Sequence, residues 1–167
     1  MLDLVSITAD ELRPNFAPVS AAVTGDFNFN IFKALSGKES ICVSPYSAAV
    51  VLSMAAEGAD GRTGEQMLEV LGHYYSKRPS ASSVKIANSI WVNEQVSINP
   101  DYDALVKEKY LSAVYERDFA LPATLKEVNK WCYDNTSGKL PSILDDMDEG
   151  MRMILLNAVY FRDKWKE

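Results

Sequence analysis

The feature that most constrains the fold is a nearly unbroken apolar run, Met153–Phe161, near the end of the printed sequence. A short run of this kind is typical of a β-strand that is covered on both faces. Such a central strand needs a hydrogen-bonded partner on each edge, yet only six residues follow it. We therefore expect an unfinished sheet, and we expect the isolated chain to aggregate, dimerise or pair with a complementary strand.

Three helices are predicted in the first part of the chain. Asp26 is a candidate cap for a helix that ends at Gly37, and Ser44 before Pro45 caps a second, mostly apolar helix that runs to about Glu57. Thr63 with Gln66 resembles a capping box for the third helix. A brief buried strand, 41–43, is expected between the first two helices.

Strands and helices then alternate. Strands are expected over 84–92 and 114–119, where β-branched and aromatic residues gather. Asn99 and Pro100 predict the start of one helix, and the spacing of apolar residues over 125–132 predicts another, which Gly138 ends. The pattern predicts a mixed α and β chain without internal repeats.

Composition fits one globular domain, because 47% of the 167 residues are hydrophobic and 24% are charged. We expect an N-terminal arm over 1–25 and the domain over 26–167. The net charge of −6 disfavours binding to nucleic acid or to an anionic membrane. The first residues lack the order of a signal peptide, which leaves an intracellular protein or a mature secreted form.

Residues that could support enzyme chemistry are sparse. His73 is the only histidine, and neither a nucleophile–base pair nor a metal-ligand spacing accompanies it, so we predict no catalytic residue, no metal and no cofactor. Cys42 and Cys132 stand far apart and are expected to be free and buried. The glycines over 58–64 lack the lysine of a phosphate-binding loop, and therefore indicate a turn between helices.

Two further patterns have ordinary explanations. The acidic residues within 145–149 miss the spacing of a calcium-binding loop and are expected to form a solvated loop. Asn135 begins an Asn-Thr-Ser sequon, which makes it a possible glycosylation site if the protein is secreted by a eukaryotic pathway.

Several segments, in this order, resemble the N-terminal part of the serpins, a family of protease inhibitors. The matches include I-C-V-S-P-Y-S at 41–47, the G-A-x-G-x-T-x-x-Q turn from Gly58, and the A-N strand from Ala87. V-N-x-W-x-x-x-x-T-x-G-K from Val128 and L-N-A-x-Y-F-x-x-x-W from Leu156 continue the series. The resemblance covers roughly 26–165 and implies an α+β, serpin-like fold: N-terminal helices packed against a mainly antiparallel sheet, incomplete without the C-terminal part.

The resemblance implies a mechanism based on conformational change. In serpins an exposed loop near the C-terminus is cleaved by the target protease and inserts into the main sheet, which traps the protease. Ser44, Ser47 and Asn157 match the polar shutter cluster under the sheet, where strands separate, and Trp165 matches the tryptophan at the breach, where insertion begins. Each also has a plainer reading: a helix cap for Ser44, a satisfied strand position for Asn157, and core packing for Trp165, as for Trp91 and Trp131.

The sequence has no counterpart of the reactive loop. We therefore expect an N-terminal fragment of a serpin whose full-length form inhibits serine or cysteine proteases, with a complementary C-terminal segment as partner. The alternative is a non-inhibitory binding or chaperone module; an enzyme is disfavoured. The chain is short between Leu71 and Val84, where some serpins bind sulfated polysaccharides, so heparin binding is not expected. Family resemblance implies an extracellular location. Nothing explains Asp163, which stands where many serpins have glycine.

Overall fold

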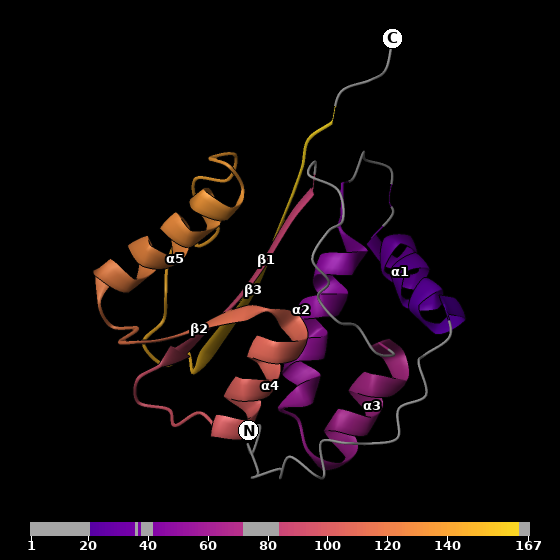
Figure 1. Cartoon of the computed structure of the whole chain (residues 1–167), viewed down its shortest axis with the longest axis horizontal. Helices are drawn as coiled ribbons and strands as arrows, with labels where there is room; N and C mark the ends of the chain where they lie inside the picture. Colours follow the sequence, from indigo (N-terminus) through magenta and orange to yellow (C-terminus); the bar gives the residue numbers. More distant parts are fainter. Residues whose placement is uncertain (1–20, 36, 38–41, 72–83, 164–167) are drawn as a thin grey trace. The chain divides into compact units, whose positions relative to one another are not determined.

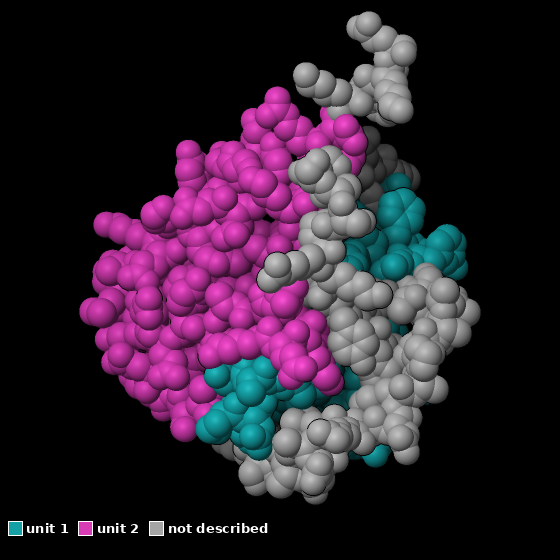
Figure 2. Space-filling view, in the orientation of Figure 1, with its two compact units in different colours: residues 1–75, 99–106 teal, residues 76–98, 107–167 magenta. Residues whose placement is uncertain are grey.

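The computed structural model describes residues 21–35, 37, 42–71 and 84–163. The elements follow one another along the chain as shown in Figure 1. The chain divides into two compact units, one of residues 1–75 and 99–106 and the other of residues 76–98 and 107–167 (Figure 2). Each unit has its own hydrophobic cluster. The helix α4 (Pro100–Tyr110) contributes residues to both units.

The first unit is built from three helices and the start of α4. They are α1 (Ala21–Leu35), α2 (Pro45–Glu57) and α3 (Gly61–Leu71). Small and apolar side chains of α2 pack against both neighbours. The core cluster consists of buried Phe27, Ala49, Ala56 and Leu71, with Ile31, Tyr46, Met67 and Leu68 partly buried against it. The predicted second helix is confirmed, including its cap at Ser44.

Two predicted helix starts were wrong. Helix α1 begins at Ala21, so Asp26 lies within the helix. Ala21 and Ala22 favour a helical start because alanine has the highest helix propensity. The rest of the expected arm lies outside the described residues. Helix α3 begins at Gly61, so Thr63 is already helical and does not cap it. Asp60 serves the first turn instead, because its Oδ1 accepts a hydrogen bond from Gly61 N at 2.7 Å.

The predicted strand over 41–43 is also absent from its described part. Cys42 and Val43 have no strand conformation, and Cys42 is exposed rather than buried. A strand needs a hydrogen-bonded neighbour, and none pairs with these two residues in the described ranges. Cys132, by contrast, is free and buried as predicted.

The second unit contains a three-stranded sheet in the order β2–β1–β3. Strand β1 (Val84–Asn93) pairs in parallel with β2 (Ser112–Arg117) and antiparallel with β3 (Met153–Phe161). The described sheet is therefore mixed. β2 begins two residues earlier than predicted, whereas β3 has the predicted bounds and forms one edge of the described sheet.

Helix α5 (Pro122–Asn135) covers one face of this sheet. The register places Trp91 opposite Ile154 and Ser89 opposite Leu156, so these positions share a face. The hydrophobic cluster on that face contains buried Trp91, Phe119, Val128 and Leu156, with Tyr115, Trp131, Leu144, Met147 and Ile154 partly buried against it. Trp91 and Trp131 are packing residues, as expected.

The other face of β3 is exposed at its last residues. Side chains alternate along a strand, so Val159 and Phe161 lie on the opposite face from Leu156. Val159 is 37% exposed and Phe161 is 66% exposed. The expectation that both faces of this strand are covered is therefore wrong at Val159 and Phe161, whereas Met153 and Leu155 on the same face are partly buried.

Candidate functional site

A pair of asparagines lies at the middle of the sheet, on the face away from α5. Asn88 of β1 and Asn157 of β3 are directly opposite each other in the antiparallel pairing. Asn157 Nδ2 donates a hydrogen bond to Asn88 Oδ1 at 2.7 Å. Asn88 Nδ2 in turn donates to the carbonyl oxygen of Tyr110 at 2.6 Å. The two side chains thus link both strands to the end of α4.

The chain of hydrogen bonds ends at an unused acceptor. Asn157 Oδ1 is buried and has no hydrogen-bond partner among the described residues. Leaving a buried acceptor without a donor costs about 1–3 kcal/mol. Asn88, at the other end of the pair, is 3% exposed and fully engaged. Asn157 Oδ1 can therefore accept one more hydrogen bond.

The asparagine pair lies beside an open edge. Within the described ranges, β3 pairs only with β1, so its second edge has no strand partner. β3 is nine residues long, and in the described ranges no strand pairs with the peptide groups on that side. An extended segment could add to this edge by main-chain hydrogen bonds. Such a strand would run next to Asn157.

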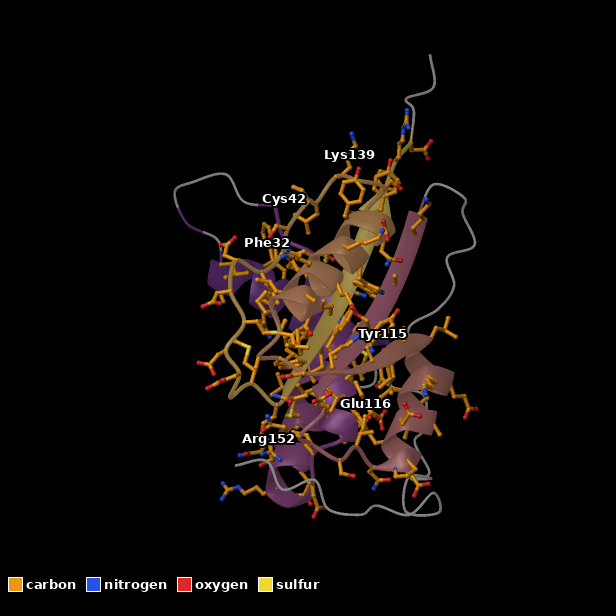
Figure 3. The ribbon with its side chains drawn as sticks, turned by 90° about the vertical axis from the view of Figure 1, so that its left-hand side faces the viewer. Phe32, Cys42, Tyr115, Glu116, Lys139 and Arg152 are labelled. Carbon is orange, nitrogen blue, oxygen red and sulfur yellow. The ribbon has the colours of Figure 1, made fainter. Side chains whose placement is uncertain are left out.

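The face under α5 is packed with aromatic side chains. The rings of Trp91 and Tyr115 stack with centroids 4.3 Å apart, and Trp91 Nε1 donates to Ser89 Oγ at 3.0 Å. Tyr115 of β2 is labelled in Figure 3. Burial and stacking of large aromatic groups hold this face together.

Asn129 forms hydrogen bonds with the segment that follows α5. Its Oδ1 accepts hydrogen bonds from Ile143 N at 2.8 Å and from Leu144 N at 3.0 Å, and its Nδ2 donates to Leu144 O at 2.8 Å. One side chain of α5 thus satisfies three backbone groups of the loop that leads toward β3. This ties the path of that loop to the helix.

The sequence motifs include Asn88 and Asn129 but predict no functional role for either residue. The available signal was an amide side chain inside an otherwise apolar strand or helix face, since a buried amide must find partners. Asn88 precedes the apolar positions Ile90 and Val92 on its own face of β1, and both of these are fully buried.

Two of the predicted shutter residues lie in the first unit and touch each other. The hydroxyl oxygens of Ser44 and Ser47 are 2.8 Å apart, and Ser44 Oγ accepts from Ser47 N at 3.2 Å. Ser44 is exposed and Ser47 is half-buried. This geometry is that of a helix cap. The third predicted shutter residue, Asn157, belongs to the second unit.

The remaining predicted positions are less informative. Trp165 and His73 lie outside the described residues. Asn135 is the last residue of α5 and is half-buried, and its Nδ2, where a glycan would attach, donates to Trp131 O at 2.8 Å. The loop before β3 exposes its acidic residues, Asp145, Asp146, Asp148 and Glu149. Met147, which lies among them, is half-buried.

Groups with altered acidity serve structure in this chain. Burial, and secondarily the charge of Glu57, raises the pKa of Tyr102 well above its usual range, so its hydroxyl stays protonated and donates to Met54 O at 2.9 Å. Burial also raises the pKa of the Cys132 thiol. In the described ranges, no cluster of three or more His, Cys, Asp or Glu side chains could hold a metal ion.

The described helices include none that is long and apolar enough to cross a membrane.

Comparison with protein families gives a direct assignment. The model of the serpin family, described as serine protease inhibitor, matches residues 22–167. The chain belongs to the serpin family.

Individual relatives agree with this assignment. An uncharacterized serpin-like protein of Thermococcus kodakarensis is 33% identical, over 89% of this chain and 39% of its own length. Serine protease inhibitor 42Dd of Drosophila melanogaster is 28% identical, over 77% of this chain and 40% of its own length. The chain thus spans about two fifths of the length of these curated relatives.

Solved structures confirm the predicted fold class. The thermophilic serpin tengpin in its latent state superposes with a TM-score of 0.80 at 29% identity, covering 92% of this chain and 46% of tengpin. The α+β serpin-like fold, incomplete relative to whole serpins, is as expected.

Proposed function

We propose that this chain is the N-terminal part of a serpin that, at full length, inhibits serine or cysteine endopeptidases by trapping them. In this mechanism a reactive loop is cleaved and inserts as a new strand beside β3. The observation that supports the proposal most strongly is the open edge of β3 next to the unused acceptor of Asn157. A sheet that accepts a new strand needs an edge that can pair with different strands and polar groups that can change partners.

Asn88 and Asn157 would act in sheet opening by exchanging hydrogen bonds. Strand separation beside β3 shifts its main chain, and a buried polar group that loses its partner at that moment costs free energy. The pair gives Asn157 a donor contact to β1 while leaving Oδ1 for a group on the arriving segment. The proposed shutter role therefore rests on Asn157 together with Asn88.

Ser44 and Ser47 have a weaker claim to this role. Their hydroxyl contact and the cap of α2 account for both side chains within the first unit. We propose them as shutter residues because of the family resemblance. The same resemblance is the reason for proposing Trp165 as the breach residue. The complementary C-terminal serpin segment is the expected partner, and an extracellular location is part of the same proposal.

The direct test is protease trapping by the protein at its full natural length. It is incubated with a trypsin-like, a chymotrypsin-like and an elastase-like serine protease and with a papain-like cysteine protease. Formation of a covalent complex that survives denaturing electrophoresis with at least one of them supports the proposal. Cleavage of the protein by every protease without a complex would show a non-inhibitory binding or chaperone module instead.

A variant tests the site separately from the family function. In the full-length protein, Asn157→Ala removes the link to Asn88, and we expect inhibitory activity to be lost faster on mild heating, because the sheet rearranges more easily. Asn30→Ala, at an exposed position of α1, is the matched control and should behave as the unchanged protein. Equal rates for both variants would remove Asn157 from the sheet-opening site.

A further inference from the structure

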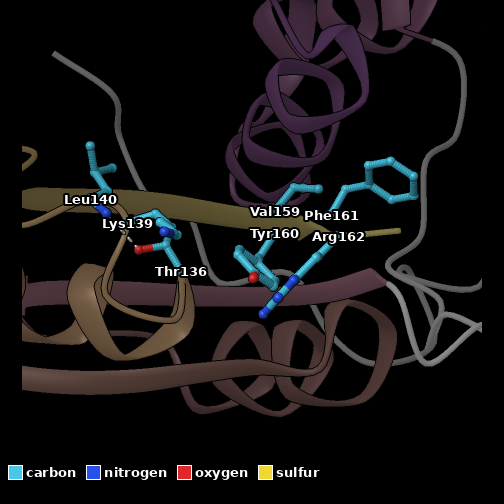
Figure 4. A pocket seen from close by; sticks show the side chains of 7 residues that line it. All are labelled: Thr136, Lys139, Leu140, Val159, Tyr160, Phe161 and Arg162. Carbon is cyan, nitrogen blue, oxygen red and sulfur yellow. Dashed lines mark hydrogen bonds between the residues drawn. The ribbon is translucent and has the colours of Figure 1, made fainter. Parts of the chain in front are cut away.

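A pocket of about 680 Å³ opens between the end of α5 and the last residues of β3 (Figure 4). This volume is in the range of sites that bind small organic molecules. Tyr160 of β3 and Arg162, which follows the strand, form one wall. The lining residues are Thr136, Lys139, Leu140, Val159, Tyr160, Phe161 and Arg162.

The wall contributed by α5 is held in shape by hydrogen bonds. Thr136 Oγ1 donates to Cys132 O at 2.8 Å and accepts from Leu140 N at 3.0 Å. Gly138 N donates to Tyr133 O at 2.8 Å, and the positive φ of 75° at Gly138 lets the chain turn back. These bonds fix Lys139 and Leu140 at the rim before any ligand arrives, which lowers the entropic cost of binding.

Positive charge gathers at this pocket, although the whole chain carries a net charge of −6. Lys139 and Arg162 are exposed, and the described part of the chain gives neither of them an ion pair. Lys85 stands opposite Tyr160 on the neighbouring strand, with its Nζ 5.7 Å from the centre of the Tyr160 ring and 3.1 Å from Ser137 Oγ.

The described residues that line the pocket include no negative side chain. Asp134, close before the end of α5, is already paired with Lys130 at 2.7 Å. Asp163 follows Arg162 in the sequence and has its own interactions, and it does not line the pocket. The site thus combines cationic groups at the rim with aromatic and aliphatic surface inside.

We propose that this pocket binds a small amphipathic organic anion. Its carboxylate, sulfate or sulfonate group would be held by Arg162, whose guanidinium can donate two parallel hydrogen bonds, and by Lys139. Its apolar body would rest on Tyr160 and Leu140. The proposal does not depend on protease inhibition, because neither Asn88 nor Asn157 lines the pocket.

The test is titration calorimetry of the protein at its full natural length with two probes of the same shape. Naphthalene-2-sulfonate carries a negative charge, and naphthalene-2-sulfonamide is its neutral counterpart. We expect the sulfonate to bind at least about ten-fold more tightly, and this advantage should shrink as salt is added, because salt screens exposed charges.

Variants locate the binding site. Arg162→Gln and Lys139→Gln should each weaken sulfonate binding about three- to ten-fold, as expected for charge-assisted hydrogen bonds near solvent. Lys126→Gln, an exposed position on α5 outside the pocket, removes the same charge and should leave binding unchanged. Near-ultraviolet circular dichroism confirms that each variant is folded.

Three results would overturn the proposal. The first is no sulfonate binding by the full-length protein, which would mean that other residues cover the pocket. The second is equal binding of the charged and the neutral probe. The third is a loss of affinity for Lys126→Gln as large as that for the two pocket variants.

Discussion

The two faces of the sheet in the second unit differ in how complete they are. Under α5, Trp91, Val128 and Leu156 form a closed apolar layer in which Trp91 is only 2% exposed. On the opposite face, Phe161 is 66% exposed and Asn157 Oδ1 has no donor among the described residues. The first face is finished by this chain alone. The second is closed around Ile90 and Val92, which are fully buried, but open at its end, at Phe161.

The largest expected effect is on the finished face. Trp91→Ala should lower the free energy of unfolding by about 3–5 kcal/mol, because it leaves a cavity and removes the stack on Tyr115. Urea unfolding followed by circular dichroism measures this loss. The control is Glu116→Ala, at an exposed position of β2, for which we expect a change within about 0.5 kcal/mol. A loss below 1 kcal/mol for Trp91→Ala would show that this face is not the core of the unit.

Replacing Asn88 or Asn157 by alanine should lower the free energy of unfolding by unequal amounts. Asn88→Ala removes the hydrogen bond to Tyr110 O and the one from Asn157 Nδ2, which should cost about 2–3 kcal/mol. Asn157→Ala also removes the unused Oδ1, so its net cost in this chain should be smaller, about 1 kcal/mol. Both free energies come from denaturant unfolding. Equal costs would mean that Asn157 Oδ1 already has a donor.

The stability cost of replacing Phe161 should differ between the 167-residue chain and the full-length protein. In the 167-residue chain, Phe161→Ala should change stability by less than about 1 kcal/mol, because the ring is mostly exposed. In the full-length protein the cost should rise to about 3 kcal/mol if a further segment buries the ring. Thermal unfolding of the four proteins provides the comparison. The same small cost at both lengths would contradict the view that this face is completed by more chain.

The smallest effect concerns the turn between α4 and β2. Leu111 has a φ of 53° and is 45% exposed, so its side chain gives little packing in return for a strained backbone. Leu111→Gly should raise the free energy of unfolding by up to about 1 kcal/mol, whereas Leu111→Val should lower it. Calorimetric melting of both variants checks the sign, and a loss for glycine would show that Leu111 packs more than its exposure indicates.

Local signals in the sequence predicted much of the fold. Ser44 before Pro45, and Asn99 before Pro100, marked the starts of α2 and α4, since caps depend on neighbouring residues. The apolar run gave β3 with its observed bounds. A series of short motifs predicted the family, which the serpin match over 22–167 confirmed.

Features that depend on distant residues were harder to predict. The Asn88–Asn157 hydrogen bond joins positions 69 residues apart and depends on the register of two strands. Exposure of Cys42 reflects the lack of a strand partner in the described ranges, which the local sequence cannot show. The site role of Asn157 was inferred from the motif alone, and its unused acceptor became visible only in the folded chain.

Hydrogen exchange at β3 tests the central claim most directly. Backbone amides of Met153–Phe161 are followed by mass spectrometry in the full-length protein and in the 167-residue chain. An added strand on the open edge predicts slow exchange along β3 at full length, with alternate amides exchanging fast in the shorter chain. Fast exchange of those amides in both proteins would contradict it, because β3 would then remain an edge strand in the complete molecule.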